Sequence, residues 1–202
     1  MKLFTNEKTL MKYKYADDYI MVQNLMPTEL CKSLIRENSL PERKWSKHSW
    51  SNYDQLASPQ KAEEELDIII ATREQFKMIE KYLLEALRKY QAKYSQVEGR
   101  AGSVWIGHIS ELRFNRYKVG TQMQTHCDHI HNIFDGKYRG IPIVSFIGLL
   151  NDNYQGGEFL CRKKEIKLTR GDIVLFPSNF MYPHRINEIT KGIRHSFVGW
   201  AF

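Results

Sequence analysis

Nine short runs rich in β-branched and aromatic residues follow one another after Gly102. The runs cover residues 103–109, 110–119, 122–128, 141–150, 157–161, 165–168, 172–176, 182–186 and 193–201. Turn-forming residues stand between them, at Gly120, Asn151-Asp152-Asn153, Gly156-Gly157, Gly171 and Gly192. Many short strands at this spacing are typical of an antiparallel sandwich or barrel. The C-terminal half is therefore predicted to form a jelly-roll core.

The N-terminal half of the chain has helical periodicity. Thr28 stands at an N-cap position, and the apolar residues after it recur at helical spacing, which predicts a helix over residues 28–38. An apolar stripe that includes Met78 and Leu83 predicts a long helix from about 61 to 95. A strand is expected near 18–24, before the first helix.

These patterns predict an α+β protein in which a single domain spans residues 1–202. Residues 1–100 would provide mainly helical support, and residues 101–202 would form the jelly-roll (double-stranded β-helix) core that contains the metal site. A chain of 202 residues is long enough to bury one full core. No internal repeat or linker-like segment suggests a division into two domains.

Composition excludes several classes of protein. With 42% hydrophobic and 26% charged residues, the chain is typical of globular proteins and not of disordered or fibrous ones. Its longest apolar run, residues 141–150, is too short to cross a bilayer, so no membrane partner is expected. Three cysteines without a C-x-x-C pattern indicate a reducing, cytoplasmic setting. The net charge of +7 is compatible with nucleic acid but does not require it.

Three residues have the character of a metal site. His126 and Asp128 lie two positions apart on a strand-like run, so their side chains point to the same face. His184 supplies a second imidazole downstream. Two imidazoles and one carboxylate form the facial ligand set that holds Fe(II) and leaves open positions for other ligands. His129 and His131 have ligand-like spacing too, but they open a polar stretch, and a solvent-facing loop is the preferred interpretation for them.

Arg194 and Ser196 follow His184 and share one face of the last predicted strand. A guanidinium that points into a β core needs an anionic partner, because burying it unpaired is costly. Its planar fork suits a carboxylate, and the serine hydroxyl adds a further hydrogen bond. The alternative is that Arg194 pairs with a structural Asp or Glu.

Two other segments have open interpretations. Residues 42–60 combine aromatic and basic side chains; the preferred interpretation is a loop or edge strand whose rings cap the core, and the alternative is a substrate-facing wall. The basic run from Arg162 to Lys167 is best interpreted as a solvated hairpin, and the alternative is a nucleic-acid contact. The candidates for lining a substrate channel are Trp45, Trp50, Tyr53, His108, Arg113 and Asn115.

The run from Arg116 to Trp200 resembles the iron(II)- and 2-oxoglutarate-dependent dioxygenases of the prolyl 4-hydroxylase type. It is most similar to small bacterial and phage members that carry Arg at the co-substrate position. The matching residues are Arg116-Tyr117-x-x-Gly120, His126-x-Asp128, Leu150-Asn151-Asp152, Gly156-Gly157-Glu158, Gly171-Asp172, Phe176-Pro177-Ser178, His184 and Arg194-x-Ser196-x-x-x-Trp200. The N-terminal half carries no matching motif.

The resemblance implies a role for each position. His126, Asp128 and His184 would hold Fe(II) and form the catalytic centre. Arg194 and Ser196 would bind the distal carboxylate of 2-oxoglutarate, and the Tyr117 hydroxyl would reach the same co-substrate. Dioxygen is the second co-substrate, and the family implies ascorbate as a further cofactor. Oxidative decarboxylation of 2-oxoglutarate would release succinate and carbon dioxide while the substrate is hydroxylated.

The resemblance implies a protein or peptide substrate that is hydroxylated on a prolyl or other residue. Two departures argue against a collagen-like substrate: collagen-type enzymes carry Lys at the position of Arg194 and Tyr at the position of Met123. Trp200 replaces the second Arg of the alkylated-base demethylases, which argues against base repair. The alternatives are a nucleic acid, a free amino acid, or a non-catalytic metal-binding module. The expected location is the cytoplasm of a bacterium, or of the host cell if the protein is phage-encoded.

Overall fold

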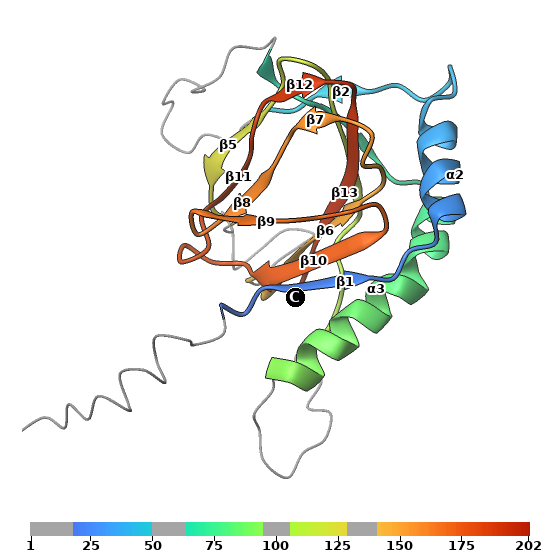
Figure 1. Ribbon diagram of the computed structural model, residues 1–202. Helices are drawn as coiled ribbons and strands as arrows, with labels where there is room; N and C mark the ends of the chain where they lie inside the picture. Colours follow the sequence, from blue (N-terminus) through green and yellow to red (C-terminus); the bar gives the residue numbers. More distant parts are fainter. Residues whose placement is uncertain (1–17, 50–63, 95–105, 129–140) are drawn as a thin grey trace, which may run out of the picture.

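The computed structural model describes residues 18–49, 64–94, 106–128 and 141–202 (Figure 1). These segments contain two helices and a larger number of short strands. In chain order the elements are β1 (Met21–Asn24), α2 (Thr28–Asn38), β2 (Ser46–Lys47), β3 (Asp67–Ile70), α3 (Arg73–Tyr94), β4 (Arg113–Tyr117), β5 (Met123–His126), β6 (Val144–Leu149), β7 (Gln155–Gly156), β8 (Phe159–Cys161), β9 (Lys164–Ile166), β10 (Asp172–Pro177), β11 (His184–Ile186), β12 (Ile189–Lys191) and β13 (Arg194–Ala201).

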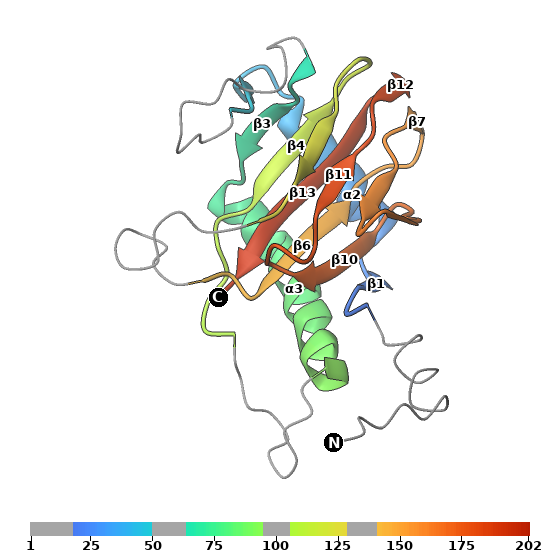
Figure 2. The same ribbon diagram turned by 90° about the vertical axis from the view of Figure 1, so that its left-hand side faces the viewer.

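The strands form one large and one smaller sheet, with a two-stranded pair, β12-β7, beside them (Figure 2). The large sheet has seven strands in the order β1-β10-β6-β13-β4-β3-β2, and the smaller one has four in the order β5-β11-β8-β9. The strand pairings within them are antiparallel. The protein is thus mostly β-sheet with two helices.

The helices cover one face of the seven-stranded sheet, and the four-stranded sheet faces the other (Figure 1). Residues of β13 alternate between these two environments. Phe197 packs with the helices, together with Leu34 of α2 and Leu83 of α3. Arg194 and Ser196, on the opposite face of β13, point between the sheets. The alternation therefore separates an apolar layer under the helices from a layer that holds polar side chains.

Glycines on the helix-covered face make room for aromatic rings on neighbouring strands. Phe197 of β13 is directly paired with Gly148 of β6, and Phe146 of β6 with Gly199 of β13. A Cβ atom added to Gly148 would overlap the Phe197 ring, and one added to Gly199 would lie 2.6 Å from the Phe146 ring. Each ring therefore lies over a backbone that carries no side chain.

Gly148→Ala should lower the free energy of unfolding by about 1–3 kcal/mol, because the added methyl group overpacks a buried layer. Gly107→Ala is the matched control, since a Cβ atom there would meet nothing closer than 3.7 Å. Urea unfolding of both variants measures the difference. Equal stabilities of the two variants would show that the ring of Phe197 can move aside at little cost.

The structure confirms some of the predicted elements and corrects others. The helix predicted over 28–38 is α2, but its N-cap residue is Pro27, with no capping side chain, and not Thr28. The helix predicted from about 61 to 95 is wrong at its start, where β3 pairs with β4, and α3 begins only at Arg73. A capping box marks that start. The backbone N–H of Gln75 donates to the Thr72 hydroxyl, and the backbone N–H of Thr72 donates to the side-chain oxygen of Gln75.

The N-terminal half contributes strands as well as helices to the fold. Strands β1, β2 and β3 join the seven-stranded sheet, so residues 1–100 are not only helical support. The strand predicted near 18–24 is shorter, as β1, and β7 and β12 have no predicted counterpart of their own. The described part of the run 103–109 adds only an isolated bridge at Ile109. Neither α2 nor α3 combines the length and apolar character that a helix needs to cross a membrane.

Candidate active site

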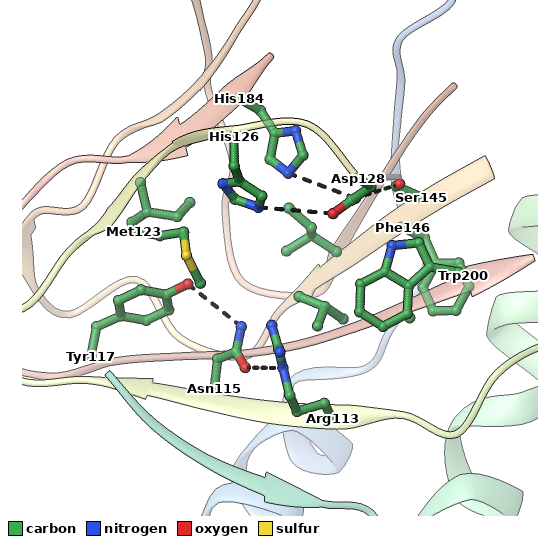
Figure 3. A pocket seen from close by; sticks show the side chains of 14 residues that line it. Arg113, Asn115, Tyr117, Met123, His126, Asp128, Ser145, Phe146, His184 and Trp200 are labelled. Carbon is green, nitrogen blue, oxygen red and sulfur yellow. Dashed lines mark hydrogen bonds and ion pairs between the residues drawn. The ribbon is translucent and has the colours of Figure 1, made fainter. Parts of the chain in front are cut away.

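A pocket opens between the two sheets, and both polar and apolar side chains line it (Figure 3). His126, Asp128 and His184 form one wall, and Arg113 and Asn115 of β4 face them from another. The remaining lining residues are Tyr117, Met123, Ser145, Phe146, Ile147, Ile186, Val198, Gly199 and Trp200. Three strands of the large sheet thus supply the floor, and β5 and β11 supply the roof.

The two imidazoles and the carboxylate converge on one point. Their ligand atoms all lie within 4.8 Å of one another. The Nε2 atom of His126 is 3.8 Å from one oxygen of Asp128, and the Nε2 atom of His184 is 3.7 Å from the other. His126 and His184 are paired directly across strands β5 and β11, which brings their rings to a centroid distance of 4.3 Å. The arrangement can hold one divalent ion on one side and leave its other side open.

Backbone carbonyls orient both imidazole rings. The Nδ1 atom of His126 is 2.8 Å from the Gln124 carbonyl oxygen, and that of His184 is 3.0 Å from the Tyr182 carbonyl oxygen. A proton on Nδ1 leaves the Nε2 lone pair free for a metal. Burial and the neighbouring His184 lower the pKa of His126 to about 4, so this ring is neutral at pH 7. The histidines are therefore arranged as ligands.

The Asp128 carboxylate is held by side chains from the seven-stranded sheet. The Ser145 hydroxyl donates a 2.6 Å hydrogen bond to it, and Ser178 is in turn hydrogen-bonded to Ser145. Burial alone would raise the pKa of Asp128, but the two imidazoles, Ser145 and the Trp200 side chain hold it below its usual value. Asp128 is therefore ionised, and one of its oxygens is fixed in direction.

Ser145→Ala should weaken binding of a divalent metal by roughly 10- to 100-fold, because the ligand carboxylate loses the hydrogen bond that orients it. Titration calorimetry with Mn(II) measures this without turnover. Ser178→Ala should have a smaller effect, since Ser178 reaches the carboxylate only through Ser145. Equal losses in both variants would indicate that the serine pair acts as a unit, and unchanged affinity in both would remove it from the site.

Arg194 is one of the most deeply buried side chains in the described part of the chain, with 1% of its surface exposed. Its Nη1 atom donates to the Ser196 hydroxyl at 3.0 Å, and its Nε atom has no hydrogen-bond partner. Among the described residues, no carboxylate forms an ion pair with it. A structural Asp or Glu partner is thus not found there, and the guanidinium is available to an anion.

Tyr117 separates Arg194 from the pocket. The two residues are paired directly across β4 and β13, and the guanidinium carbon lies 5.2 Å from the centre of the tyrosine ring. Gly157 allows this packing, because its φ of +68° suits glycine and an added Cβ atom would lie 3.1 Å from Cδ of Arg194. Burial raises the pKa of Tyr117, so its hydroxyl stays protonated. Arg194 and Ser196 lie directly behind the pocket wall.

The structure brings together the six residues predicted for the site: His126, Asp128, His184, Arg194, Ser196 and Tyr117. His129 and His131 lie outside the described residues, as do Trp50 and Tyr53. Among the channel candidates, Arg113 and Asn115 line the pocket. His108 instead stacks on Phe202, and Trp45 packs against the core under the helices.

The basic run agrees with the preferred interpretation of a solvated hairpin. The basic run forms the β8–β9 hairpin, in which Arg162 and Lys163 have positive φ angles and Arg162 pairs with Asp18. The three cysteines are free thiols. Ser145 is not among the predicted site residues. Its position as a serine within the apolar run 141–150 is the sequence signal that could have identified it.

The C-terminal part of the chain is similar to the 2-oxoglutarate- and Fe(II)-dependent oxygenases. Residues 112–202 match the model of the 2OG-Fe(II) oxygenase superfamily. The resemblance to iron(II)- and 2-oxoglutarate-dependent dioxygenases is thereby confirmed for this part of the chain. Proteins of this class use Fe(II), 2-oxoglutarate and dioxygen, and the His-Asp-His cluster supplies a matching donor set.

The relatives with similar sequences are hydroxylases. A PKHD-type hydroxylase of Crocosphaera subtropica is 36% identical over 100 residues, which cover 46% of this chain and 43% of that protein. A PKHD-type hydroxylase of Idiomarina loihiensis is 30% identical over 97 residues, which cover 46% of this chain and 42% of that protein. The match therefore spans less than half the length of these relatives.

Solved structures of prolyl hydroxylases share the fold over nearly the whole chain. A prolyl-4-hydroxylase of Pseudomonas putida has a TM-score of 0.63 at 18% identity, over 96% of this chain and 97% of that one. The viral collagen prolyl hydroxylase of Paramecium Bursaria Chlorella virus-1 has a TM-score of 0.62 at 13% identity, over 91% and 94%. At these identities the likeness establishes the fold alone.

Proposed function

We propose that this protein is an Fe(II)- and 2-oxoglutarate-dependent oxygenase that hydroxylates a residue of a protein or peptide, with prolyl as the first candidate. One observation carries the proposal. A three-donor facial site lies in the pocket wall, and directly behind it lies a buried guanidinium that has no carboxylate partner among the described residues. A metal-binding module has no use for the second feature. A prolyl hydroxylase from Trichoplax adhaerens has been solved with a peptide and shares the fold at a TM-score of 0.59.

In this proposal His126, Asp128 and His184 hold the iron, and Arg194, Ser196 and Tyr117 bind the distal carboxylate of 2-oxoglutarate. When bound, iron and 2-oxoglutarate supply the oxidative chemistry: one oxygen atom of O2 enters succinate and the other hydroxylates the substrate, with release of CO2. The residues of the chain orient the ligands. The Gln124 and Tyr182 carbonyls fix the imidazoles, and Ser145 fixes the carboxylate.

The same proposal includes the finer features of the fold. The two facing sheets would be the two halves of a double-stranded β-helix, and residues 1–202 would form one domain around it. Strands β1 to β3, which come from the N-terminal half but pair into the large sheet, support a single domain. A cytoplasmic location and a use of ascorbate remain predictions.

Formation of succinate from 2-oxoglutarate by the purified protein tests the function. Wild type with Fe(II) should form succinate slowly without substrate and faster with the correct substrate. Mass spectrometry of cell proteins incubated with the enzyme, Fe(II) and 2-oxoglutarate should then find residues that gain one oxygen atom. Tightly bound zinc together with no binding of 2-oxoglutarate would favour a non-catalytic module.

A further inference from the structure

Arg113 is a second arginine of the site, and the proposed function gives it no role. It lies on β4 two residues before Asn115, so both side chains point to the pocket (Figure 3). Its cross-strand neighbour is Val198, between Ser196 and Trp200 on β13. Arg113 therefore faces the triad from the opposite wall, and any molecule that fills the pocket lies between them.

The guanidinium of Arg113 is only partly satisfied by the protein. Its Nε atom donates a 3.0 Å hydrogen bond to the Asn115 side-chain oxygen, and its carbon lies 5.9 Å from the centre of the Trp200 ring. Among the residues that the structure describes, no carboxylate forms an ion pair with it. Asp128 lines the same pocket and its negative charge acts on Arg113, but its two oxygens lie nearest to the two imidazoles. Two Nη groups remain free to bind a ligand.

When Fe(II) and 2-oxoglutarate are bound, their charges and those of Asp128 and Arg194 can be added. Fe(II) carries two positive charges, of which Asp128 offsets one, and 2-oxoglutarate carries two negative charges. Arg194 adds one positive charge, so these four groups together are neutral. The buried carboxylate of Glu65 lies near this site, but it is paired with His48 and does not line the pocket. Among the described residues that line the pocket, none offers Arg113 a carboxylate of its own, and a partly buried guanidinium without one is costly. The missing partner is a single negative charge within the pocket.

Resting on the proposed function, we infer that Arg113 is a specificity-determining residue and that the substrate presents a carboxylate to it. The two free Nη groups form a planar fork that matches the two oxygens of a carboxylate. A phosphate dianion would exceed the single charge that is available, and a neutral prolyl ring alone would leave it unpaired. Because Arg113 and the triad line one small pocket, the carboxylate lies within a few bonds of the carbon that is hydroxylated.

Such a carboxylate has two sources, a free amino acid or an acidic side chain next to the target in a peptide. Four probes separate them. The first pair is a mixture of L-amino acids and the mixture of their amides. The second pair is a blocked pentapeptide library with Asp or Glu at its central position and the same library with Asn or Gln there. Each probe is added to wild type, Arg113→Ala and Arg113→Lys.

Two measurements are made on each combination. Titration calorimetry under nitrogen with Fe(II) and 2-oxoglutarate present reports binding without turnover, and succinate formation in air reports stimulation. With wild type, one acidic probe should bind and stimulate about tenfold or more above its amide partner. Arg113→Ala should remove this preference, and Arg113→Lys should restore part of it. Arg185→Ala, which removes an exposed charge from β11, is the control and should keep the preference.

The outcomes separate the inference from the function on which it rests. Equal responses to acidic and amide probes by a wild type that still forms succinate would overturn the role of Arg113 and leave the function standing. Loss of 2-oxoglutarate affinity in Arg113→Ala would assign Arg113 to the co-substrate and also overturn it. A wild type that neither binds 2-oxoglutarate nor forms succinate would instead contradict the proposed function.

Discussion

Asp128→Ala should abolish the Fe(II)-dependent conversion of 2-oxoglutarate to succinate. The carboxylate is the only anionic member of the triad, and both imidazoles face it at 3.7 to 3.8 Å. Without it, only the two imidazoles remain as ligands, and metal affinity should fall by more than the roughly 100-fold that loss of a supporting hydrogen bond costs. Metal content after anaerobic purification and succinate formation are the two measurements.

His126→Ala should give the same result, because it removes one of the two imidazole ligands, at the end of β5. Asp152→Ala is the matched control: it removes an exposed carboxylate that pairs with Arg170 and should leave both measurements unchanged. Turnover that persists in both triad variants would rule out the iron site, and turnover lost in the control would show that the assay reports folding.

Arg194→Met should weaken 2-oxoglutarate binding while metal binding is retained. Removing one partner of a buried charged pair costs about 2–5 kcal/mol, which corresponds to a loss of roughly 30- to several-thousand-fold in affinity. Calorimetry with Mn(II) first and 2-oxoglutarate second separates the two steps. Ser196→Ala should cost about 1.5–3 kcal/mol, at the lower end of that range, because it removes a single hydrogen bond donated by the guanidinium and leaves its charge in place.

The stability of the Arg194→Met protein without ligands distinguishes a binding residue from a structural one. Wild type buries this guanidinium without a carboxylate partner among the described residues, so an apolar side chain of similar length should not lower its melting temperature. A large drop in melting temperature, together with loss of the metal, would instead show that Arg194 supports the fold.

Local patterns in the sequence predict much of the site. His126 with Asp128 and Arg194 with Ser196 are two apart on strands, and strand alternation alone places each pair on one face. The start of α3 was also readable, since Thr72 and Gln75 form a capping box. Strand β3 was not predicted, because the apolar stripe of the following helix was extended over it. Asp67–Ile70 becomes a strand only by pairing with β4.

Pairing between distant segments decides the rest. Ser145 reaches Asp128 because β6 of the large sheet faces the segment that follows β5 of the other sheet, and that segment carries the carboxylate. Arg113 is one basic residue among many in the sequence. It becomes a candidate for substrate binding only when the order of the strands places it opposite the triad, where no described carboxylate forms an ion pair with it.

The sequence by itself determined the chemical identity of the site: two imidazoles, one carboxylate, and an arginine with a serine behind them. These features follow from residue types and from a two-residue period, which are properties of a single strand. The tertiary structure alone decided that His184 stands directly opposite His126 and that Arg194 and Arg113 find no acidic partner among the described residues. The physical reason is that strand order and register depend on the packing of both sheets, to which the whole chain contributes.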